Sequence, residues 1–252
     1  MTGATSGIGE ALARHYASQG ASLGLFARRE PELHRLAGAL SPADVLSYAG
    51  DVRDLGALSR AAKDFIDRVG VPDIVIGNAG VSRGTLTQFA EDVAVFRTIL
   101  DTNVMGLVHT FQPFLPSMLD AKRGTMVGIA SLAGVRGIPG SGAYSASKAA
   151  AIGYLESLRV ELRSSGVAVV TICPGYIATP MTEKNPYAMP FLTASDKAAR
   201  LIARAIDRRK SLYIVPWQMA IVARVLRVLP NWLFDRVFER AGRKPRQLDG
   251  GV

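Results

Sequence analysis

The sequence predicts an α/β protein in which helices cover both faces of a doubly wound parallel sheet, in three layers. Apolar strand-like runs alternate with helical patterns along most of the chain, as a parallel sheet with crossover helices requires. A glycine-rich turn leads into the first helical pattern. The length of 252 residues is that of one large α/β domain. We therefore expect one domain over residues 1–216 and an added helical tail over residues 217–252.

The strands and helices of this domain can be placed from the pattern of apolar residues. Strands are expected near residues 22–27, 45–49, 73–77, 124–130, 167–173 and 212–215. Helices are expected near residues 8–19, 31–40, 54–69, 91–119, 143–165 and 195–209. Pro113 should interrupt the fourth helix and Gly166 should terminate the fifth. Right-handed crossovers then place a ligand crevice beyond the carboxyl ends of the strands.

The first helical pattern follows three glycines, Gly3, Gly7 and Gly9, spaced Gly-x-x-x-Gly-x-Gly. Glycines in this position let the backbone turn tightly and approach a pyrophosphate, which then meets the unpaired amides at a helix N-terminus. Taken alone, the motif also fits a flexible glycine turn.

Only two residues precede Gly3, although a phosphate-binding turn should follow a buried strand. In such a sheet this strand lies in the middle, so its loss would expose strand edges. We interpret the opening as a start site placed too far downstream, or a truncated sequence, in preference to a fold without the strand. Mass spectrometry of the native N-terminus tests this interpretation.

Composition and charge narrow the class of protein. Hydrophobic residues make up 48% of the chain and charged residues 20%, which is typical of a globular protein. The net charge of +9 is concentrated in residues 196–252, where thirteen Lys and Arg face five Asp and Glu. Such a basic region can indicate nucleic acid, an anionic membrane or acidic ligands. No nucleic-acid-binding motif accompanies it, so we expect no nucleic acid partner.

The single cysteine, Cys173, lies in an apolar strand-like run and is expected to be a core residue. One cysteine cannot form an internal disulfide, which favours a reducing compartment and a cytoplasmic location. His15, His34 and His109 lack metal-ligand spacing, so no metal site is expected. No secretory signal is visible.

Tyr144 and Lys148 lie four residues apart in a helical pattern, so both side chains project from one face. A phenol can give or take a proton during hydride transfer, but its ordinary pKa of about 10 keeps it protonated at neutral pH. A nearby ammonium lowers that pKa and can also hold a ribose hydroxyl. On its own, this pair also fits an ordinary surface pair on a helix.

Together, the motifs resemble the short-chain dehydrogenase/reductase family, in its single-domain form, over residues 2–216. The run Thr2 to Gly9 resembles the nucleotide turn of the family. The other matching positions are Asp51-Val52 (adenine contact), Asn78-Ala79-Gly80 (the motif of the fourth strand), Asn103, Ser131, Tyr144 and Lys148 (the catalytic tetrad) and Pro174-Gly175 (the turn beside the nicotinamide). The resemblance implies a Rossmann-like sheet.

The resemblance also implies roles for the four tetrad residues. Tyr144 would donate the proton when a carbonyl is reduced, and Lys148 would lower its pKa and bind the nicotinamide ribose. Ser131 would hydrogen-bond the substrate oxygen. Asn103 would hold a water that links Lys148 to solvent, although a buried Asn that satisfies backbone groups is an adequate alternative. The expected cofactor-binding residues are Gly3, Thr5, Ser6, Gly7, Ile8, Gly9, Arg28, Arg29, Asp51, Val52, Asn78, Ala79, Gly80, Tyr144, Lys148, Pro174, Gly175, Ile177 and Thr179.

The positive charge that follows the strand at residues 22–27 distinguishes between NAD and NADP as the cofactor. Arg28 and Arg29 stand there, and no carboxylate is available to hold ribose hydroxyls as in an NAD enzyme. Two guanidiniums suit a phosphate, so we expect NADP in preference to NAD. Alternatively, the two arginines merely begin a solvated helix with Glu30 and Glu32.

The segment from Tyr176 to Ser195 is expected to be an irregular loop, and in the family this region closes over the substrate. Its side chains include Met181, Pro186, Tyr187, Met189, Pro190, Phe191 and Leu192. This apolar content suits a hydrophobic carbonyl compound. Equally, these side chains could pack against the tail of the same chain.

The tail carries two amphipathic segments, residues 217–229 and 231–241, separated by Pro230. In the first, Ile221, Val222, Val225, Leu226, Val228 and Leu229 form one apolar arc with Arg224 and Arg227 outside it. Both segments are too short and too interrupted to span a bilayer. They could lie on an anionic membrane surface, but docking on the same domain or on a second subunit is the preferred interpretation.

We therefore expect an NADP(H)-dependent oxidoreductase that interconverts a carbonyl and a secondary or primary alcohol on a hydrophobic small molecule. The rival is a non-catalytic NADP-binding protein anchored to a membrane or partner by its basic tail, and the intact tetrad argues against it. The resemblance also implies a homo-dimer or tetramer assembled through the helices near 91–119 and 143–165.

Overall fold

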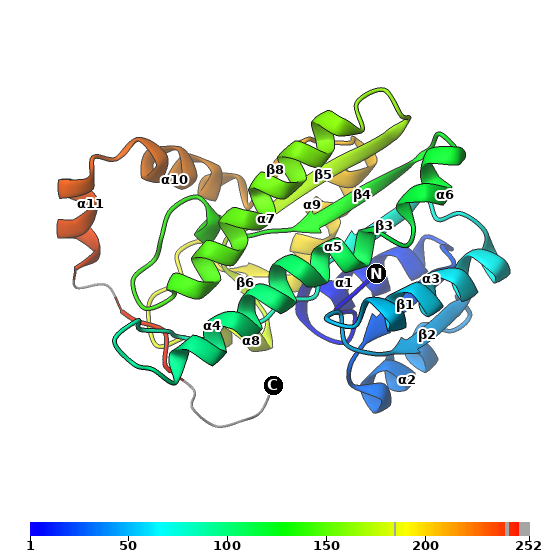
Figure 1. Ribbon diagram of the computed structural model, residues 1–252, viewed down its shortest axis with the longest axis horizontal. Coiled ribbons are helices and arrows are strands. Elements are labelled where there is room, and N and C mark those ends of the chain that lie inside the picture. The colour runs from blue at the N-terminus through cyan, green and yellow to red at the C-terminus, as the bar shows by residue number, and fades with distance from the viewer. Residues whose placement is uncertain (184, 240–241, 247–252) are drawn as a thin grey trace.

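The structure is a computed structural model that describes residues 1–183, 185–239 and 242–246. Strands and helices alternate along the chain, and the strands run parallel (Figure 1). The strands are β1 (Leu23–Ala27), β2 (Val45–Ala49), β3 (Ile74–Gly77), β4 (Gly124–Ile129), β5 (Val167–Pro174), β6 (Ile177–Ala178), β7 (Thr193–Ala194) and β8 (Leu212–Val215). All six expected strands are present, which confirms the α/β prediction.

The helices of the domain are α1 (Gly7–Ser18), α2 (Glu30–Ala39), α3 (Leu55–Val69), α4 (Asp92–Leu100), α5 (Gly106–Phe111), α6 (Leu115–Asp120), α7 (Gly142–Glu161), α8 (Pro180–Glu183) and α9 (Ser195–Asp207). The expected interruption near Pro113 lies between α5 and α6. A π-helical turn, η1 (Asp101–Met105), joins α4 to α5 and was not expected. The fifth expected helix ends earlier than predicted, at Glu161.

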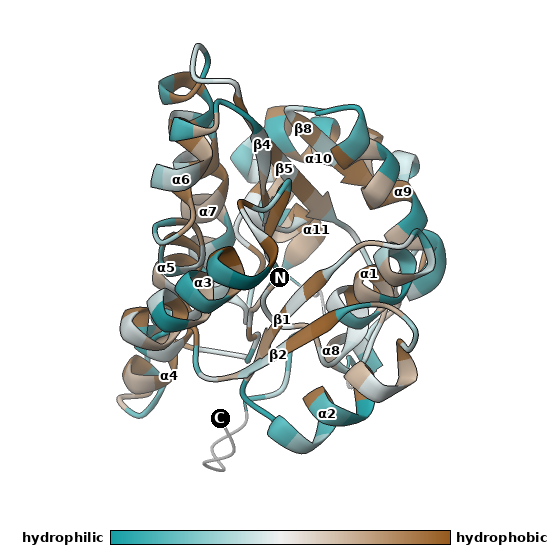
Figure 2. Cartoon of the chain, turned by 90° about the vertical axis from the view of Figure 1, so that its right-hand side faces the viewer, coloured by the Kyte–Doolittle hydropathy of each residue, from teal (hydrophilic) through white to brown (hydrophobic). Residues whose placement is uncertain are grey.

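Two hydrophobic cores show why the molecule has three layers. Successive strand residues face opposite sides, so Val127 on β4 and Val170 on β5 pack with α1 and α9. Their neighbours Met126 and Val169 pack with α5 and α7 on the other side. Figure 2 shows α5, α6 and α7 on one side of the strands and α9 and α10 on the other.

The parallel sheet is divided into two parts, β1–β2 and β3–β4–β5–β8. Met1 and Thr2 lie at the division: Phe26 N donates to Met1 O (2.9 Å) and Thr2 N donates to Ile76 O (3.0 Å). A cavity of about 450 Å³ adjoins them and is lined by residues of both β1 and β3. The two residues thus occupy the end of the position where the sequence predicts a central strand. Whether a strand precedes them in the native protein stays a prediction.

The tail forms the two helices expected there, α10 (Trp217–Val228) and α11 (Asn231–Phe238). Residues 240 and 241, at the end of the second expected segment, lie outside the described residues. The apolar arc expected on α10 does not face the domain: Met219 and Ala223 are the buried residues of this helix, whereas Ile221 and Val225 of the arc are exposed. The helix packs beside β8, and Met219 lies against Gly175 in the loop after β5.

Arg136 holds the two tail helices against the domain. Its guanidinium donates to the carbonyl oxygens of Leu226 (2.8 Å) and Leu229 and to Asn231 Oδ1 (2.7 Å). It also lies 4.1 Å from the centroid of the Phe234 ring. The cation therefore satisfies carbonyls at the C-terminus of α10, where positive charge is favourable. Within the described residues, no helix has the length and apolar character needed to cross a bilayer.

Candidate active site

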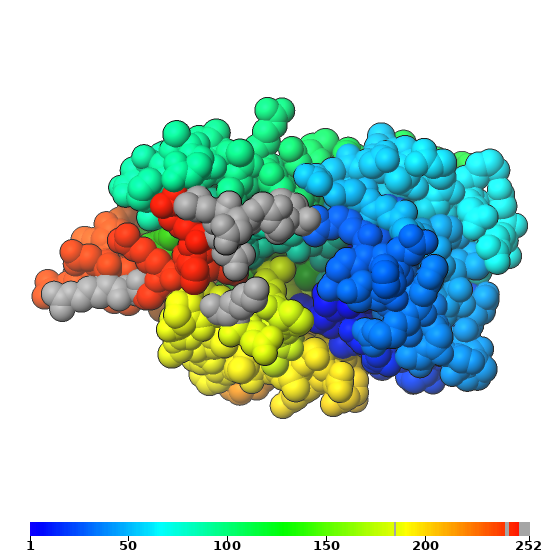
Figure 3. Space-filling model, turned by 90° about the horizontal axis from the view of Figure 1, so that it is seen from below, coloured from blue at the N-terminus to red at the C-terminus, as the bar shows by residue number. Residues whose placement is uncertain are grey.

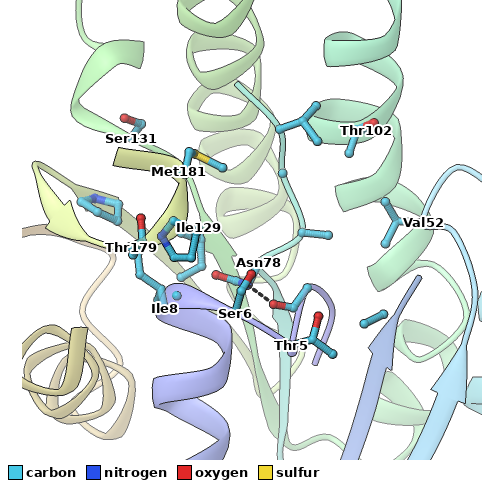
Figure 4. A pocket seen from close by; sticks show the side chains of 18 of the residues that line it. Thr5, Ser6, Ile8, Val52, Asn78, Thr102, Ile129, Ser131, Thr179 and Met181 are labelled. Atoms are coloured by element: carbon cyan, nitrogen blue, oxygen red, sulfur yellow. Dashed lines mark hydrogen bonds between the residues drawn. The ribbon is translucent and has the colours of Figure 1, made fainter. Parts of the chain in front are cut away.

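A cleft of about 250 Å³ opens at the carboxyl ends of the strands. It is lined by the glycine turn and by residues that follow β1, β2, β3, β4 and β5 (Figure 4). The structure brings together in this cleft every residue of the expected catalytic and cofactor set except Gly9 and Asn103. Their roles in binding and catalysis stay predictions.

The glycine turn has the conformation that only glycine adopts readily. Gly3 and Gly7 have φ angles of +64° and +57°, in the left-handed region. A Cβ on Gly3 would lie 2.8 Å from Ala79 Cα, and one on Gly9 would lie 2.2 Å from Gly3 O. Gly9 therefore permits close packing behind the turn instead of lining the cleft. The first amides of α1 are left facing the cleft, an arrangement that fits a pyrophosphate.

Asn78 fastens the glycine turn to the end of β3. Its Nδ2 donates to Gly3 O (3.0 Å) and to Thr2 O (3.2 Å), and its backbone N donates to Thr2 Oγ1 (3.2 Å). The donors of the Asn78 side-chain amide are thus already used by backbone carbonyls of the protein itself. Asn78 shapes the cleft floor by positioning the turn.

Tyr144 and Lys148 lie one turn apart on α7 and face the cleft together. Lys148 Nζ is 5.8 Å from the centroid of the Tyr144 ring and donates to Ile129 O (2.8 Å) at the end of β4. Ser131 follows β4 directly, and its Oγ accepts from Ala133 N (3.2 Å) at the start of the 3₁₀ turn η2 (Leu132–Gly134). The positions of Ser131, Tyr144 and Lys148 are therefore set by two neighbouring elements, β4 and α7.

Burial sets the protonation of this group. It lowers the pKa of Lys148 to about 8 and raises the pKa of the Tyr144 phenol, a rise that the hydrogen bond with Ser131 opposes. The direction for Tyr144 is opposite to that expected from an ammonium one turn away, because the desolvation of the phenolate is the largest effect. Burial also raises the pKa of Cys173, a core thiol, to about 11.

Asn103 lies on the π-helical turn and is almost fully buried. Its Nδ2 donates to Val81 O (2.9 Å) and Ser147 Oγ (2.9 Å), while its Oδ1 accepts from Val81 N (2.8 Å). These bonds fit the alternative of a buried Asn that satisfies backbone groups. A Cβ on Gly80 would lie 3.2 Å from Asn103 Oδ1 and 3.6 Å from Lys148 Nζ, so this glycine keeps the space between them open.

Arg28 and Arg29 follow β1 at the far end of the cleft. Arg29 Nη2 donates to Thr5 Oγ1 (3.2 Å), and its Nη1 is 3.6 Å from Glu32 Oε1. Arg28 Nη1 is 4.0 Å from Asp51 Oδ2. Burial opposes ionisation of Asp51, but hydrogen bonds from Arg53 outweigh it and lower the pKa of the carboxyl. Both guanidiniums are about half exposed and remain accessible to a ligand.

The segment between Tyr176 and Ser195 is not the irregular loop that the sequence predicts. β6 and β7 pair within it, and Thr193 N donates to Tyr176 O (2.9 Å). Strands of two residues are too short to leave a periodic pattern in the sequence. Met181 of this segment lines the cleft (Figure 4). Met181 and Thr182 both line the cleft and also a second, adjoining pocket.

The second pocket has a volume of about 130 Å³ and shares Ser131 and Tyr144 with the cleft. Its other lining residues are Ser82, Leu132, Ala133, Ile138, Ser141, Pro174, Gly175, Tyr176, Met181, Thr182, Asn185, Tyr187, Leu226 and Lys244. Leu226 belongs to α10, and Tyr187 belongs to the segment between Tyr176 and Ser195, which we call the lid. Lid and tail therefore line one pocket together, which fits the alternative that the lid packs against the tail.

Several residues of the two cavities were not found from the sequence. Thr102 lines the cleft from the π-helical turn, and Lys244 reaches the second pocket from near the end of the chain. A threonine in a helical pattern carries no signal of a site, and a lysine in a basic tail is ordinary. Among the described residues, no group of three or more His, Cys, Asp or Glu is close enough to hold a metal ion.

A parallel doubly wound sheet with a glycine turn at its carboxyl edge, and Ser, Tyr and Lys in the same cleft, defines the class of dinucleotide-binding oxidoreductases. The family model described as short chain dehydrogenase matches residues 1–189. The chain therefore belongs to the short-chain dehydrogenase/reductase family.

Individual proteins agree with this assignment. An uncharacterised oxidoreductase of Myxococcus xanthus is 39% identical over 242 residues, which cover 95% of each chain. A short-chain dehydrogenase/reductase of Burkholderia phymatum in complex with NAD superposes with a TM-score of 0.82 at 25% identity, over 98% of this chain and 96% of its own. An alcohol dehydrogenase of the archaeon Thermococcus sibiricus, complexed with 5-hydroxy-NADP, superposes with a TM-score of 0.76 at 25% identity. The match covers 85% of this chain and 94% of that protein's chain.

Proposed function

We propose that the protein is an NADP(H)-dependent oxidoreductase that interconverts a carbonyl group and a secondary or primary alcohol on a hydrophobic substrate. The observation that carries the proposal is the convergence of Ser131, Tyr144 and Lys148 in a cleft that also contains the glycine turn. The largely apolar lining of the second pocket, which includes Leu132, Ile138 and Leu226, supports a hydrophobic substrate.

The geometry supports the following division of work during carbonyl reduction. The dinucleotide, when bound, supplies the hydride that is added to the carbonyl carbon. Ser131 donates a hydrogen bond to the carbonyl oxygen while negative charge develops on it. Tyr144 gives that oxygen its proton and becomes a phenolate, which the ammonium of Lys148 stabilises. Oxidation of the alcohol uses the same groups in reverse.

Initial rates of NADPH oxidation over a panel of ketones, aldehydes and 3-oxoacyl compounds test the reaction class. Turnover of at least one carbonyl compound by the purified protein is expected. Tight NADPH binding without turnover of any of them would favour the rival, a non-catalytic NADP-binding protein.

The choice of NADP rests on Arg28 and Arg29. The structures similar to this chain carry either NAD or an NADP analogue, so the fold alone does not decide between the two. Two accessible guanidiniums beside Thr5 and Ser6 provide donors for the ribose phosphate that only NADP has. A hydrogen bond to a charged group contributes about 1.5–3 kcal/mol, so loss of the pair should weaken NADPH use at least about tenfold.

The double variant Arg28→Ser, Arg29→Ser tests this proposal against Arg35→Ser on the exposed side of α2 as the matched control. The double variant should lose kcat/KM with NADPH and keep it with NADH, whereas the control should change neither. A wild-type preference for NADH would contradict the assignment.

We also propose a membrane-surface contact for the tail. The outward side of α10 and α11 exposes Trp217, Ile221, Val225, Val228 and Trp232, with Val228 exposed to 80%. The basic charge of the tail suits anionic lipid headgroups. Flotation with anionic liposomes at low salt should bring the protein to the lipid fraction, and zwitterionic liposomes should not. Absence of binding to both would eliminate the contact.

A homo-dimer or tetramer in a cytoplasmic, reducing location completes the proposal. Val93 on α4, Met105 on η1 and Val160 on α7 are exposed apolar side chains on the helices expected to form the subunit interface. Light scattering during size-exclusion chromatography should give a multiple of the chain mass. Cell fractionation tests the location.

A further inference from the structure

The described C-terminal segment, residues 242–246, contributes Lys244 to the second pocket, and we call this segment the strap. Figure 3 shows it in red between the green surface that includes residues 85–92 and the yellow lid surface. Gly84 N donates to Pro245 O (3.1 Å). On the lid side, a Cβ on Gly242 would lie 2.9 Å from Tyr187 Cβ. The strap therefore contacts the loop after β3 on one side and the lid on the other, and its Lys244 lines the pocket.

Arg246 fixes the end of the strap. Its Nε donates to Asp92 Oδ2 (2.9 Å), and its Nη2 donates to Asp92 Oδ1 (3.1 Å) and Glu91 Oε1 (2.9 Å). The guanidinium also stacks 3.5 Å from the centroid of the Phe89 ring. Since the Asp92 side chain is only 4% exposed, this is a partly buried bidentate pair, and it gives the strap a defined position.

Lys244, two residues earlier, has no comparable counter-charge. Its Nζ donates to Ser82 Oγ (2.9 Å) and lines the same pocket as Ser131 and Tyr144. No Asp or Glu is among the described residues that line this pocket, and no described carboxylate forms a salt bridge with Lys244. Burial lowers the pKa of its ammonium.

A partly buried ammonium whose bonded partner is a neutral hydroxyl is costly, and an anion brought by the substrate would offset that cost. Ser82 accepts from Lys244, so its own proton remains available for the same anion. One pocket thus contains two donors, Lys244 and Ser82, together with Ser131 and Tyr144, a combination that matches a molecule with both an anionic group and a carbonyl. Tyr176, Tyr187 and Leu226, which are mainly apolar, line the same pocket.

We propose that Lys244 is a specificity-determining residue that binds an anionic oxygen group of the substrate, a carboxylate or a phosphate ester, while the carbonyl lies at Ser131 and Tyr144. This inference rests on the proposed function of the same site. It names the substrate class as hydrophobic carbonyl compounds with an acidic group.

Paired substrates test the inference. An aryl ketone with a terminal carboxylate is compared with its methyl ester, and a phosphate-ended ketone forms a second arm that separates the two anions. Lys244→Met should lower kcat/KM for the better anionic substrate at least about tenfold, mainly through KM, since one hydrogen bond to a charged group is lost. The ester should be unaffected. Lys244→Arg should restore part of the loss, and Arg243→Met, on the same strap, should have no effect.

Equal losses for acid and ester, or no loss for either, would overturn the role of Lys244 while leaving the proposed reaction intact. Calorimetric binding of an aryl carboxylate without a ketone supplies a readout that needs no turnover. Wild type should bind this probe at least about tenfold more tightly than Lys244→Met. Equal affinity, or no binding to either, counts against the inference. If no carbonyl compound is reduced but this difference is found, the proposed reaction fails and the anion site stands.

Discussion

The chemistry proposed for this protein depends at the residue scale on Tyr144, whose phenol must release a proton that burial makes it retain. Burial raises its pKa, the bond with Ser131 opposes that rise, and Lys148 lies 5.8 Å from its ring. The sequence predicted which residues meet, because a four-residue spacing on a helix fixes a shared face. It did not predict the direction of the pKa shift, since desolvation depends on the β4 and β5 side chains around the phenol.

Tyr144→Phe should lower kcat by about 10²–10⁴-fold, the usual contribution of general acid–base catalysis. The phenylalanine ring keeps the shape of the site, so the dissociation constant for NADPH should stay nearly unchanged in a fluorescence titration. Tyr154→Phe, further along α7 where the ring stacks on Phe111 away from the cleft residues, is the matched control and should retain turnover. Full activity of Tyr144→Phe would rule out the mechanism.

Lys148 should make the reaction pH-dependent in a defined direction. Its pKa is lowered from 10.5 to about 8, so the ammonium is present below that pH and is lost as the pH rises through it. Carbonyl reduction needs the ammonium, and kcat/KM should therefore fall above about pH 8. Lys148→Arg keeps its charge because the arginine pKa exceeds about 12, so whatever activity it retains should not decline there. A profile that is flat across this range in wild type would contradict this role.

At the element scale, the structure departs from the sequence pattern where packing, not periodicity, decides. The arc predicted for α10 grouped Ile221 with Leu226, but the helix buries Met219 and Ala223 instead. Nothing in the tail itself shows that Arg136, from the loop after η2, will bind the end of this helix. The π-helical turn that carries Asn103 could not be predicted from the sequence either, because one extra residue in a helical turn hardly changes a short apolar pattern.

Arg136→Ala should loosen α10 and α11 from the domain. The change removes hydrogen bonds to two backbone carbonyls and to Asn231, worth about 1–3 kcal/mol together in a partly exposed setting. Limited proteolysis should cut residues 217–238 faster in this variant than in Arg224→Ala, an exposed arginine on the same helix. Identical cleavage rates in the two variants would show that Arg136 does not hold the tail.

At the scale of the whole molecule, the alternation of strands and helices was enough to predict the sheet, its crossovers and the position of the cleft. Most of the candidate site followed, because residues after parallel strands meet at one edge. The exceptions are Gly9 and Asn103, which do not line the cleft. Gly9 packs closely against Gly3, and Asn103 hydrogen-bonds Ser147 of α7. The sheet is divided at Met1 and Thr2, and the central strand that the sequence pattern places before them stays a prediction. The contribution of the strap could not be predicted, since it depends on a contact between residues 154 positions apart.

Coenzyme binding should stabilise the molecule selectively. A ligand that binds only the folded state raises the free energy of unfolding by about 2.7 kcal/mol at 100 times its dissociation constant. NADPH should therefore raise the melting temperature more than NADH at the same concentration, and the Arg28→Ser, Arg29→Ser variant should lose that difference. A larger shift with NADH in wild type would contradict the NADP assignment.

The most direct test of the account is to follow the hydride itself. NADPH deuterated at the nicotinamide C4 on the transferring face is supplied with a carbonyl compound that the enzyme reduces, and the alcohol is analysed by mass spectrometry. The account predicts one deuterium on the carbinol carbon with wild type, and almost no alcohol with Tyr144→Phe. Alcohol without deuterium on that carbon, or the same yield from both proteins, would contradict it.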